Sequence, residues 1–107
     1  MRILYLGDIV GRSGRTAIRE RLLPLRNRLR ADFVVVNGEN ATAGAGLSGD
    51  HAKAMLDSGV DVLTLGDHAF DQKDMLTFIE RERRIIRPVN FAKQAPGVGS
   101  RVFDAPG

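Results

Sequence analysis

The stretch Phe33-Val34-Val35-Val36-Asn37-Gly38-Glu39-Asn40 is the clearest indication of the fold class. Its first half is a continuous apolar run with three valines, which is typical of a buried strand in a parallel sheet. Its second half places a carboxylate and a carboxamide directly after that strand. Because a buried charge without a partner is costly and no Lys or Arg lies nearby in the sequence, Glu39 is a candidate for a functional site rather than for the core.

Two other apolar runs end in the same way. Ile3-Leu4-Tyr5-Leu6 is followed by Gly7-Asp8, and Val62-Leu63-Thr64-Leu65 is followed by Gly66-Asp67-His68. In open α/β sheets, the carboxyl ends of the strands form the crevice in which ligands bind. We therefore expect a shared, oxygen-rich cluster that suits a cation, and its members are Asp8, Glu39, Asn40, Asp67 and His68.

The alternation of apolar runs and helical patterns predicts an α/β fold with a mostly parallel sheet, built from βαβαβαβ units. We expect strands at residues 2–7, 33–37, 61–65 and 84–87. A further strand is expected to begin at residues 101–104. The first helix should follow a glycine-rich turn at residues 7–14. It should kink or restart at Pro24, because proline lacks a backbone donor and clashes with the preceding turn.

The ends of the second and third helices have their own signals. Ser48 is the expected N-cap of a helix that runs to about Ser58, and Gly59 fits the left-handed position after its end. Asp71, with Asp74 three residues later, resembles a capping pair for the third helix. Asp71 is thus expected to be an N-cap.

Composition limits the classes of function. The 107 residues allow one domain, and the absence of cysteine excludes disulfides, thiolate metal sites and cysteine nucleophiles. The net charge is only +3, and no aromatic residues interleave with the arginines, so we expect no nucleic-acid partner. The first ten residues lack the length and flanks of a signal peptide, and no run is long enough to span a bilayer. We expect a cytoplasmic protein without a membrane partner.

Two further residues stand near the expected site in sequence. Arg12 borders the loop that carries Asp8, which makes it the arginine that we would choose for a contact with substrate. His51, near the start of the second helix, is interpreted as a solvated helix residue.

The strand-end motifs together resemble a known family. Gly-Asp-Ile-Val-Gly at 7–11, Asn-Gly-Glu-Asn at 37–40 and Gly-Asp-His at 66–68 resemble the bacterial calcineurin-like metallophosphoesterases of the 2′,3′-cyclic nucleotide phosphodiesterase type. Residues 87–90 and 96–103 resemble the stretch that follows in that family. The matches cover essentially the whole chain, in order. The resemblance implies a single, incomplete domain over residues 1–107, equivalent to the N-terminal half of the family's αββα sandwich.

The resemblance also implies a dinuclear metal site, usually with iron or manganese. By position, Asp8, Glu39 and Asn40 correspond to ligands of one ion, and Glu39 would bridge to a second ion that Asp67 also binds. His68 matches the family's proton donor. Hard oxygen ligands suit Mn and Fe, and a pair of ions activates water and neutralises phosphate oxygens. The implied substrate is a small phosphoester.

This sequence departs from the family in two ways. The family has Asn at position 67, whereas here Asp67 adds negative charge, which acts against a phosphate and affects metal preference. The family's chain is also longer, and its second half supplies histidine ligands and a second sheet. Only His51 and His68 occur here. One face of the sheet should therefore be uncovered, and such a patch leads us to expect a homo-oligomer.

Two other functions stay open. Gly7, Gly11 and Gly14 lie between a strand and a helix, as in a dinucleotide-binding turn, so the chain could be a non-catalytic nucleotide-binding module. The spacing is not G-x-G-x-x-G, and Asp8 would face a pyrophosphate unless a metal intervened. The other possibility is an inactive scaffold fragment that lacks the C-terminal histidine ligands.

Overall fold

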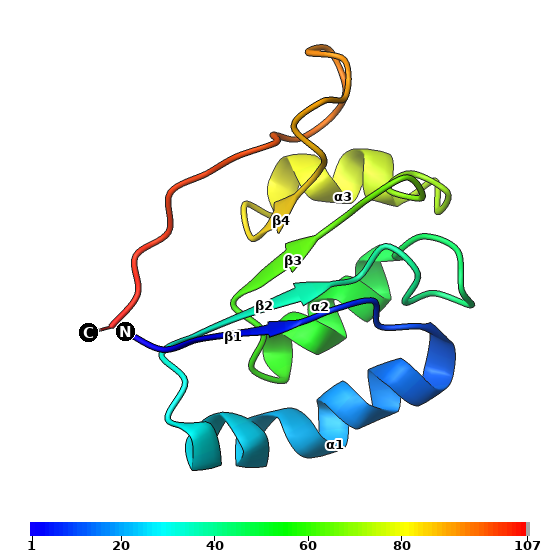
Figure 1. Cartoon of the computed structure of the whole chain (residues 1–107). Helices are drawn as coiled ribbons and strands as arrows, with labels where there is room; N and C mark the ends of the chain where they lie inside the picture. The colour runs from blue at the N-terminus through cyan, green and yellow to red at the C-terminus, as the bar shows by residue number, and fades with distance from the viewer. Residues whose placement is uncertain (107) are drawn as a thin grey trace.

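The computed structural model describes residues 1–106, and its centre is a parallel sheet of four strands (Figure 1). Each strand pairs with the next one along the chain, and all three pairings are parallel. The predicted α/β fold class is confirmed. The strands are β1 (Ile3–Leu6), β2 (Phe33–Asn37), β3 (Val62–Thr64) and β4 (Ile85–Ile86).

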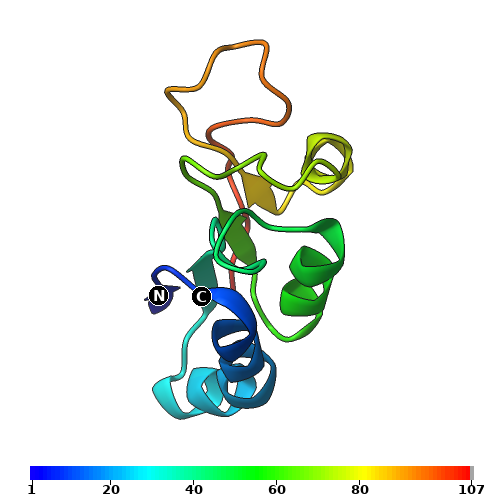
Figure 2. The same ribbon diagram turned by 90° about the vertical axis from the view of Figure 1, so that its right-hand side faces the viewer.

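Three helices cover one face of this sheet (Figure 2). They are α1 (Gly11–Leu29), α2 (Gly49–Asp57) and α3 (Met75–Arg81). Because consecutive strands are neighbours and right-handed crossovers always return on the same side, every helix lies on that side. Among residues 1–106, no helix combines the length and the apolar character that crossing a membrane requires.

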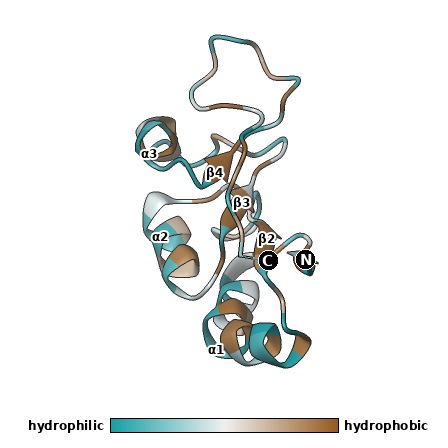
Figure 3. Cartoon of the chain, turned by 90° about the vertical axis from the view of Figure 1, so that its left-hand side faces the viewer, coloured by the Kyte–Doolittle hydropathy of each residue, from teal (hydrophilic) through white to brown (hydrophobic). Residues whose placement is uncertain are grey.

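The core lies between the helices and the helix-facing side of the strands. β2, β3 and β4 are hydrophobic along the ribbon (Figure 3). Alternation along β2 directs Val34 and Val36 towards the helices, where they are buried. The largest fully buried side chains are Leu22, Leu47, Leu63, Met75, Ile85, Val34 and Val36.

The opposite face of the sheet is apolar, and it is open at β1, whereas Val62 of β3 is buried on it. Ile3 and Tyr5 of β1 are 63% and 57% exposed, and the register places Phe33 and Val35 of β2 beside them. None of the helices within residues 1–106 lies on this face (Figure 2). The structure thus confirms the expected uncovered face, and the homo-oligomer inferred from it stays a prediction.

The first helix differs from the prediction at both points of interest. It begins at Gly11, inside the expected glycine-rich turn, and it runs through Pro24 without a break. Pro24 is exposed, so the carbonyl oxygen that proline leaves without a backbone donor can accept from water instead. Of the two alternatives expected at Pro24, the restart is therefore wrong, and the kink stays a prediction.

The strand expected at residues 101–104 does not form. This segment crosses the amino ends of the strands rather than running alongside one of them, so its backbone has no strand to pair with (Figure 1). Its attachment is instead through a side chain, because the rings of Phe103 and Phe33 have centroids 6.1 Å apart.

The ends of α2 agree with the sequence signals. The Ser48 hydroxyl accepts a hydrogen bond from the His51 backbone N–H at 3.2 Å, which is the expected N-cap. At the other end Gly59 has a φ of 112°, and the Val60 N–H donates to the Met55 carbonyl at 3.3 Å. This pair of features forms a Schellman-type end, which glycine permits because it has no Cβ.

Candidate metal site

Backbone hydrogen bonds join the three loops that follow β1, β2 and β3. The Ile9 N–H donates to the Asn37 carbonyl at 3.1 Å, and the Gly11 N–H donates to the Asn40 carbonyl at 3.1 Å. The Gly38 N–H donates to the Thr64 carbonyl at 2.9 Å. The loops that carry the predicted site residues therefore meet at the carboxyl edge of the sheet.

Asp8 and Asn40 contact each other across this edge. The Asn40 amide nitrogen, Nδ2, donates to Asp8 Oδ1 at 2.9 Å. Because a carboxylate only accepts, this bond fixes the orientation of the amide and directs Asn40 Oδ1 elsewhere. That oxygen is buried and has no hydrogen-bond partner within residues 1–106. A buried acceptor without a donor fits a cation, which is the ligand that the sequence implied.

The backbone of Asp8 is also unusual. Its φ is 41°, in the left-handed region that costs free energy for any residue with a Cβ. Asp tolerates this conformation better than most residues, and such strain is concentrated at functional sites. The outlier falls on the predicted metal ligand of the first loop.

Glu39 lies directly against the backbone of Gly66. A Cβ added at position 66 would overlap both carboxylate oxygens of Glu39. The acid that follows β2 is therefore held beside the end of β3, next to Asp67 in the chain. Only a residue without a Cβ leaves room for this approach, which explains the glycine physically.

His68 is oriented by Asp71 rather than standing alone. His68 Nδ1 and Asp71 Oδ2 are 2.6 Å apart, and both side chains are exposed. This hydrogen bond and the charge of Asp71 raise the pKa of His68, and Glu39 and Asp67 act in the same direction against a desolvation effect. The prediction that Asp71 is an N-cap is wrong, because its carboxylate is bonded to His68.

The partner of Asp74 also differs from the prediction. Asp74 precedes α3, but its side chain makes no capping bond there. Instead, Asp74 Oδ2 accepts from the Gly49 N–H at 2.9 Å, at the start of α2. The carboxylate thus satisfies a free backbone donor of the neighbouring helix.

The predicted ligands come together in pairs rather than as one closed cluster. Asp8 joins Asn40, and Glu39 joins the turn that carries Asp67. Within residues 1–106, no three side chains of Asp, Glu, His or Cys converge closely enough to hold a metal ion. Arg12 is exposed and makes no hydrogen bond or ion pair in the described part of the chain.

Sequence reasoning missed two residues that support the loop after Asn40. Arg15 Nη1 donates to the Ala41 carbonyl at 2.6 Å. His51, expected on the solvated surface, is half-buried, and its Nδ1 lies 2.7 Å from Thr42 Oγ1. The signal available for His51 was its place three residues after the N-cap Ser48, where a side chain can reach back to the preceding loop.

Comparison with known proteins supports the class that this fold and edge site suggest, a phosphoesterase. Residues 4–107 match the family described as YmdB-like protein, and the chain belongs to that family. Over its full length, the chain is 37% identical to 2′,3′-cyclic-nucleotide 2′-phosphodiesterase of Bacillus subtilis (strain 168). It covers 40% of the length of that protein. The resemblance drawn from the strand-end motifs is confirmed.

Two crystal structures have the same fold over most of the chain. A hypothetical protein from Thermus thermophilus is 37% identical, with a TM-score of 0.86 over 92% of this chain and 38% of that one. A structure described as a novel phosphatase from Mycoplasma pneumoniae is 38% identical, with a TM-score of 0.87 over 95% of this chain and 38% of that one. Relatives of this chain are therefore named as a phosphodiesterase and a phosphatase.

The contact between Glu39 and Gly66 can be tested by a double-mutant cycle in metal-free protein. Gly66 does not have a positive φ, so Gly66→Ala should act through the overlap with Glu39 and cost about 1–3 kcal/mol in the free energy of unfolding. Glu39→Ala removes the overlapping atoms. The double variant should therefore recover at least about 1 kcal/mol relative to additivity in urea unfolding.

Gly7→Ala is the matched control, because a Cβ there would meet its nearest atom, Tyr5 Cε2, at 3.6 Å, an ordinary contact. It should change stability by no more than about 0.5 kcal/mol. Strict additivity of Gly66→Ala and Glu39→Ala would show that the two groups do not touch.

The pKa values of the two histidines should be shifted in opposite directions. Asp71 raises the pKa of His68, whereas burial and the charge of Arg15 lower the pKa of His51, both relative to 6.5. In a metal-free NMR titration, His68 should therefore stay protonated to higher pH than His51. Asp71→Asn should lower the pKa of His68 and leave His51 unchanged. Equal midpoints, or a shift of both histidines in Asp71→Asn, would contradict this geometry.

Proposed function

We propose that the protein is a metal-dependent phosphodiesterase that hydrolyses small phosphoesters such as 2′,3′-cyclic nucleotides. The observation that carries the proposal is the buried Asn40 Oδ1, which has no donor in residues 1–106 and belongs to an amide that Asp8 holds in place. Membership of a family with named phosphoesterases supports the reaction class.

Two metal ions, iron or manganese, would be held by the residues at the carboxyl edge. Asp8, Glu39 and Asn40 would bind one ion, and Glu39 and Asp67 the other. Oxygen donors of this kind match the preference of Mn and Fe for hard ligands. When bound, such a pair of ions supplies an activated water and neutralises the charge of the phosphate oxygens.

The chain's own residues supply the proton and the orientation. Asp71 accepts from His68 Nδ1–H, which fixes the ring and stabilises its protonated form. The N–H at Nε2 is then available to protonate the leaving ribose oxygen. Arg12, in the first turn of α1 and exposed, is the proposed contact for a phosphate oxygen.

Metal content and hydrolysis of 2′,3′-cyclic AMP test this function on the native full-length protein. Purified protein should contain Fe or Mn, and turnover with added Mn²⁺ should stop on chelation. His68→Asn should lower kcat by about 100-fold or more while metal content is kept, because only the proton donor is lost. Glu39→Gln should lower metal content and activity together.

Asp57→Asn is the matched control for Glu39→Gln, since Asp57 is an exposed acid at the end of α2, paired with Lys53 at 3.0 Å. It should keep both metal content and rate. Absence of turnover from the verified full-length protein would reject the proposal. Retention of a nucleotide without metal would favour the non-catalytic module. A stable fold with neither metal nor turnover would favour the inactive scaffold, and full activity in Glu39→Gln would show that Glu39 does not hold the metal.

A further inference from the structure

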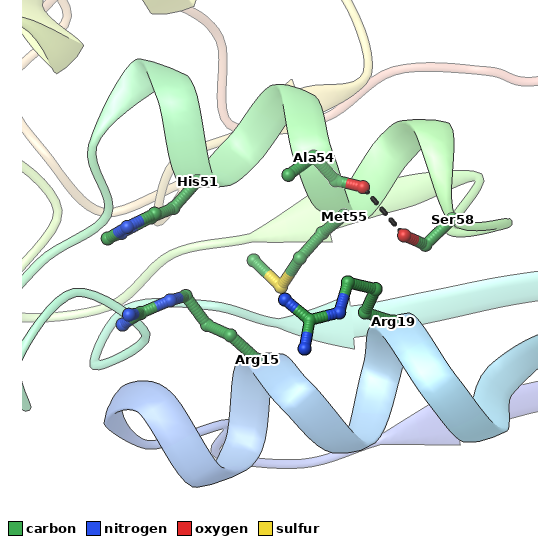
Figure 4. Close-up of a pocket in the computed structure, with 6 residues that line it drawn as sticks. All are labelled: Arg15, Arg19, His51, Ala54, Met55 and Ser58. Atoms are coloured by element: carbon green, nitrogen blue, oxygen red, sulfur yellow. Dashed lines mark hydrogen bonds between the residues drawn. The ribbon is translucent and has the colours of Figure 1, made fainter.

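A groove separates α1 from α2 on the helical side of the molecule (Figure 4). It encloses a space of about 200 Å³. Its polar lining consists of basic side chains and one hydroxyl, and no carboxylate is among the lining residues. These residues are Arg15 and Arg19 from α1 and His51, Ala54, Met55 and Ser58 from α2.

Arg15 provides a fixed cation at one end of the groove. It is half-buried, and its Nη1 is held by the Ala41 carbonyl at 2.6 Å. A guanidinium has five N–H donors in a planar fork, so this bond leaves most of them available. In Figure 4 the Arg15 guanidinium from α1 and the His51 ring from α2 lie one above the other, at the same end of the groove. A ligand between the two helices would meet both.

Arg19 adds a second cation one turn further along α1. Its guanidinium lies below the sulfur of Met55 in Figure 4. The acid nearest to it is Glu20, at 3.8 Å, in a pair whose side chains are 69% and 59% exposed. Such an exposed pair is weak, so Arg19 is free to exchange Glu20 for a stronger anionic partner.

His51 contributes a neutral donor. Thr42 Oγ1 accepts from the Ser48 N–H at 2.9 Å, so the Thr42 hydroxyl hydrogen is free to donate to His51 Nδ1. The imidazole is then the tautomer with its N–H on Nε2. Burial and Arg15 lower the pKa of His51 and favour this neutral form, against Asp50 and Asp74, neither of which lines the groove.

We propose that this groove binds a phosphate-type oxyanion, with Arg15, Arg19 and His51 as its donors. The planar fork of arginine matches phosphate oxygens, and charge-assisted hydrogen bonds of this kind are the strong ones. The ligand is either free phosphate or the phosphate group of a mononucleotide. No residue of this groove belongs to the proposed metal site, so the two sites are tested independently.

A ligand in this groove would contact residues that support the loop after β2. Arg15 holds Ala41, the residue after Asn40, and His51 holds Thr42. An anion on Arg15 and His51 would therefore contact the same side chains that support this loop.

An NMR titration of metal-free protein tests the groove, because without metal a phosphate has no ion to bind at the carboxyl edge. Inorganic phosphate should cause saturable shifts of the amides around His51, Met55 and Ser58, at constant ionic strength. Arg19→Gln should weaken binding about tenfold, as expected for the loss of one charge-assisted contact. Since Arg19 is exposed, the variant should fold.

Arg28→Gln is the matched control. Arg28 lies nine positions after Arg19 on the same helix, about two and a half turns, so it is on the opposite side of α1. It should leave the affinity unchanged. Tighter binding of AMP than of phosphate at the same amides would identify a nucleotide phosphate, and equal affinity would identify free phosphate. Shifts that do not saturate, or equal weakening in both variants, would overturn the proposal.

Discussion

The site depends on the close approach of the Glu39 carboxylate to the backbone of Gly66. The parallel register pairs Asn37 of β2 with Thr64 of β3, so Glu39 and Gly66 each follow their paired residues by two positions. A side chain on one strand end and a missing Cβ on the next therefore meet because of the register. This contact joins two of the three loops that carry the predicted ligands.

The arrangement of the sheet explains why these loops are accessible. Each strand is adjacent to the next in sequence, and all helices lie on one face, so the helices leave the carboxyl edge open (Figure 2). The first loop is joined to the second by the bond from Asn40 to Asp8. The main contribution of the two shorter helices, α2 and α3, is to the hydrophobic core, through residues such as Met55 and Met75. The polar residues at the edge are then free to serve a ligand rather than the fold.

Much of the fold could be predicted from local patterns. β2 has the predicted bounds, and the signals of Ser48 and Gly59 were correct, because strand periodicity and helix ends depend on neighbouring residues. The absence of a restart at Pro24 has a physical cause. The penalty for proline in a helix depends on whether water can reach the freed carbonyl, and that exposure is decided by packing.

Roles that depend on distant partners could not be predicted in this way. Asp71 and Asp74 have the spacing of a capping pair, yet one binds His68 and the other binds Gly49, 25 residues away. Phe103 lacks a pairing strand and packs on Phe33 instead. In contrast, Glu39 could be named as a candidate from the sequence alone, because a charge directly after a buried strand is costly without a partner, and its role as a metal ligand stays a prediction.

The proposed metal site requires that Asp8, Glu39, Asn40 and Asp67 direct their oxygens at shared metal ions. The most direct test is anomalous diffraction from crystals of the full-length protein soaked with Mn²⁺. We expect anomalous peaks within bonding distance of Asn40 Oδ1 and the carboxylates of Asp8 and Glu39. Peaks located elsewhere, with these side chains left unligated, would contradict it.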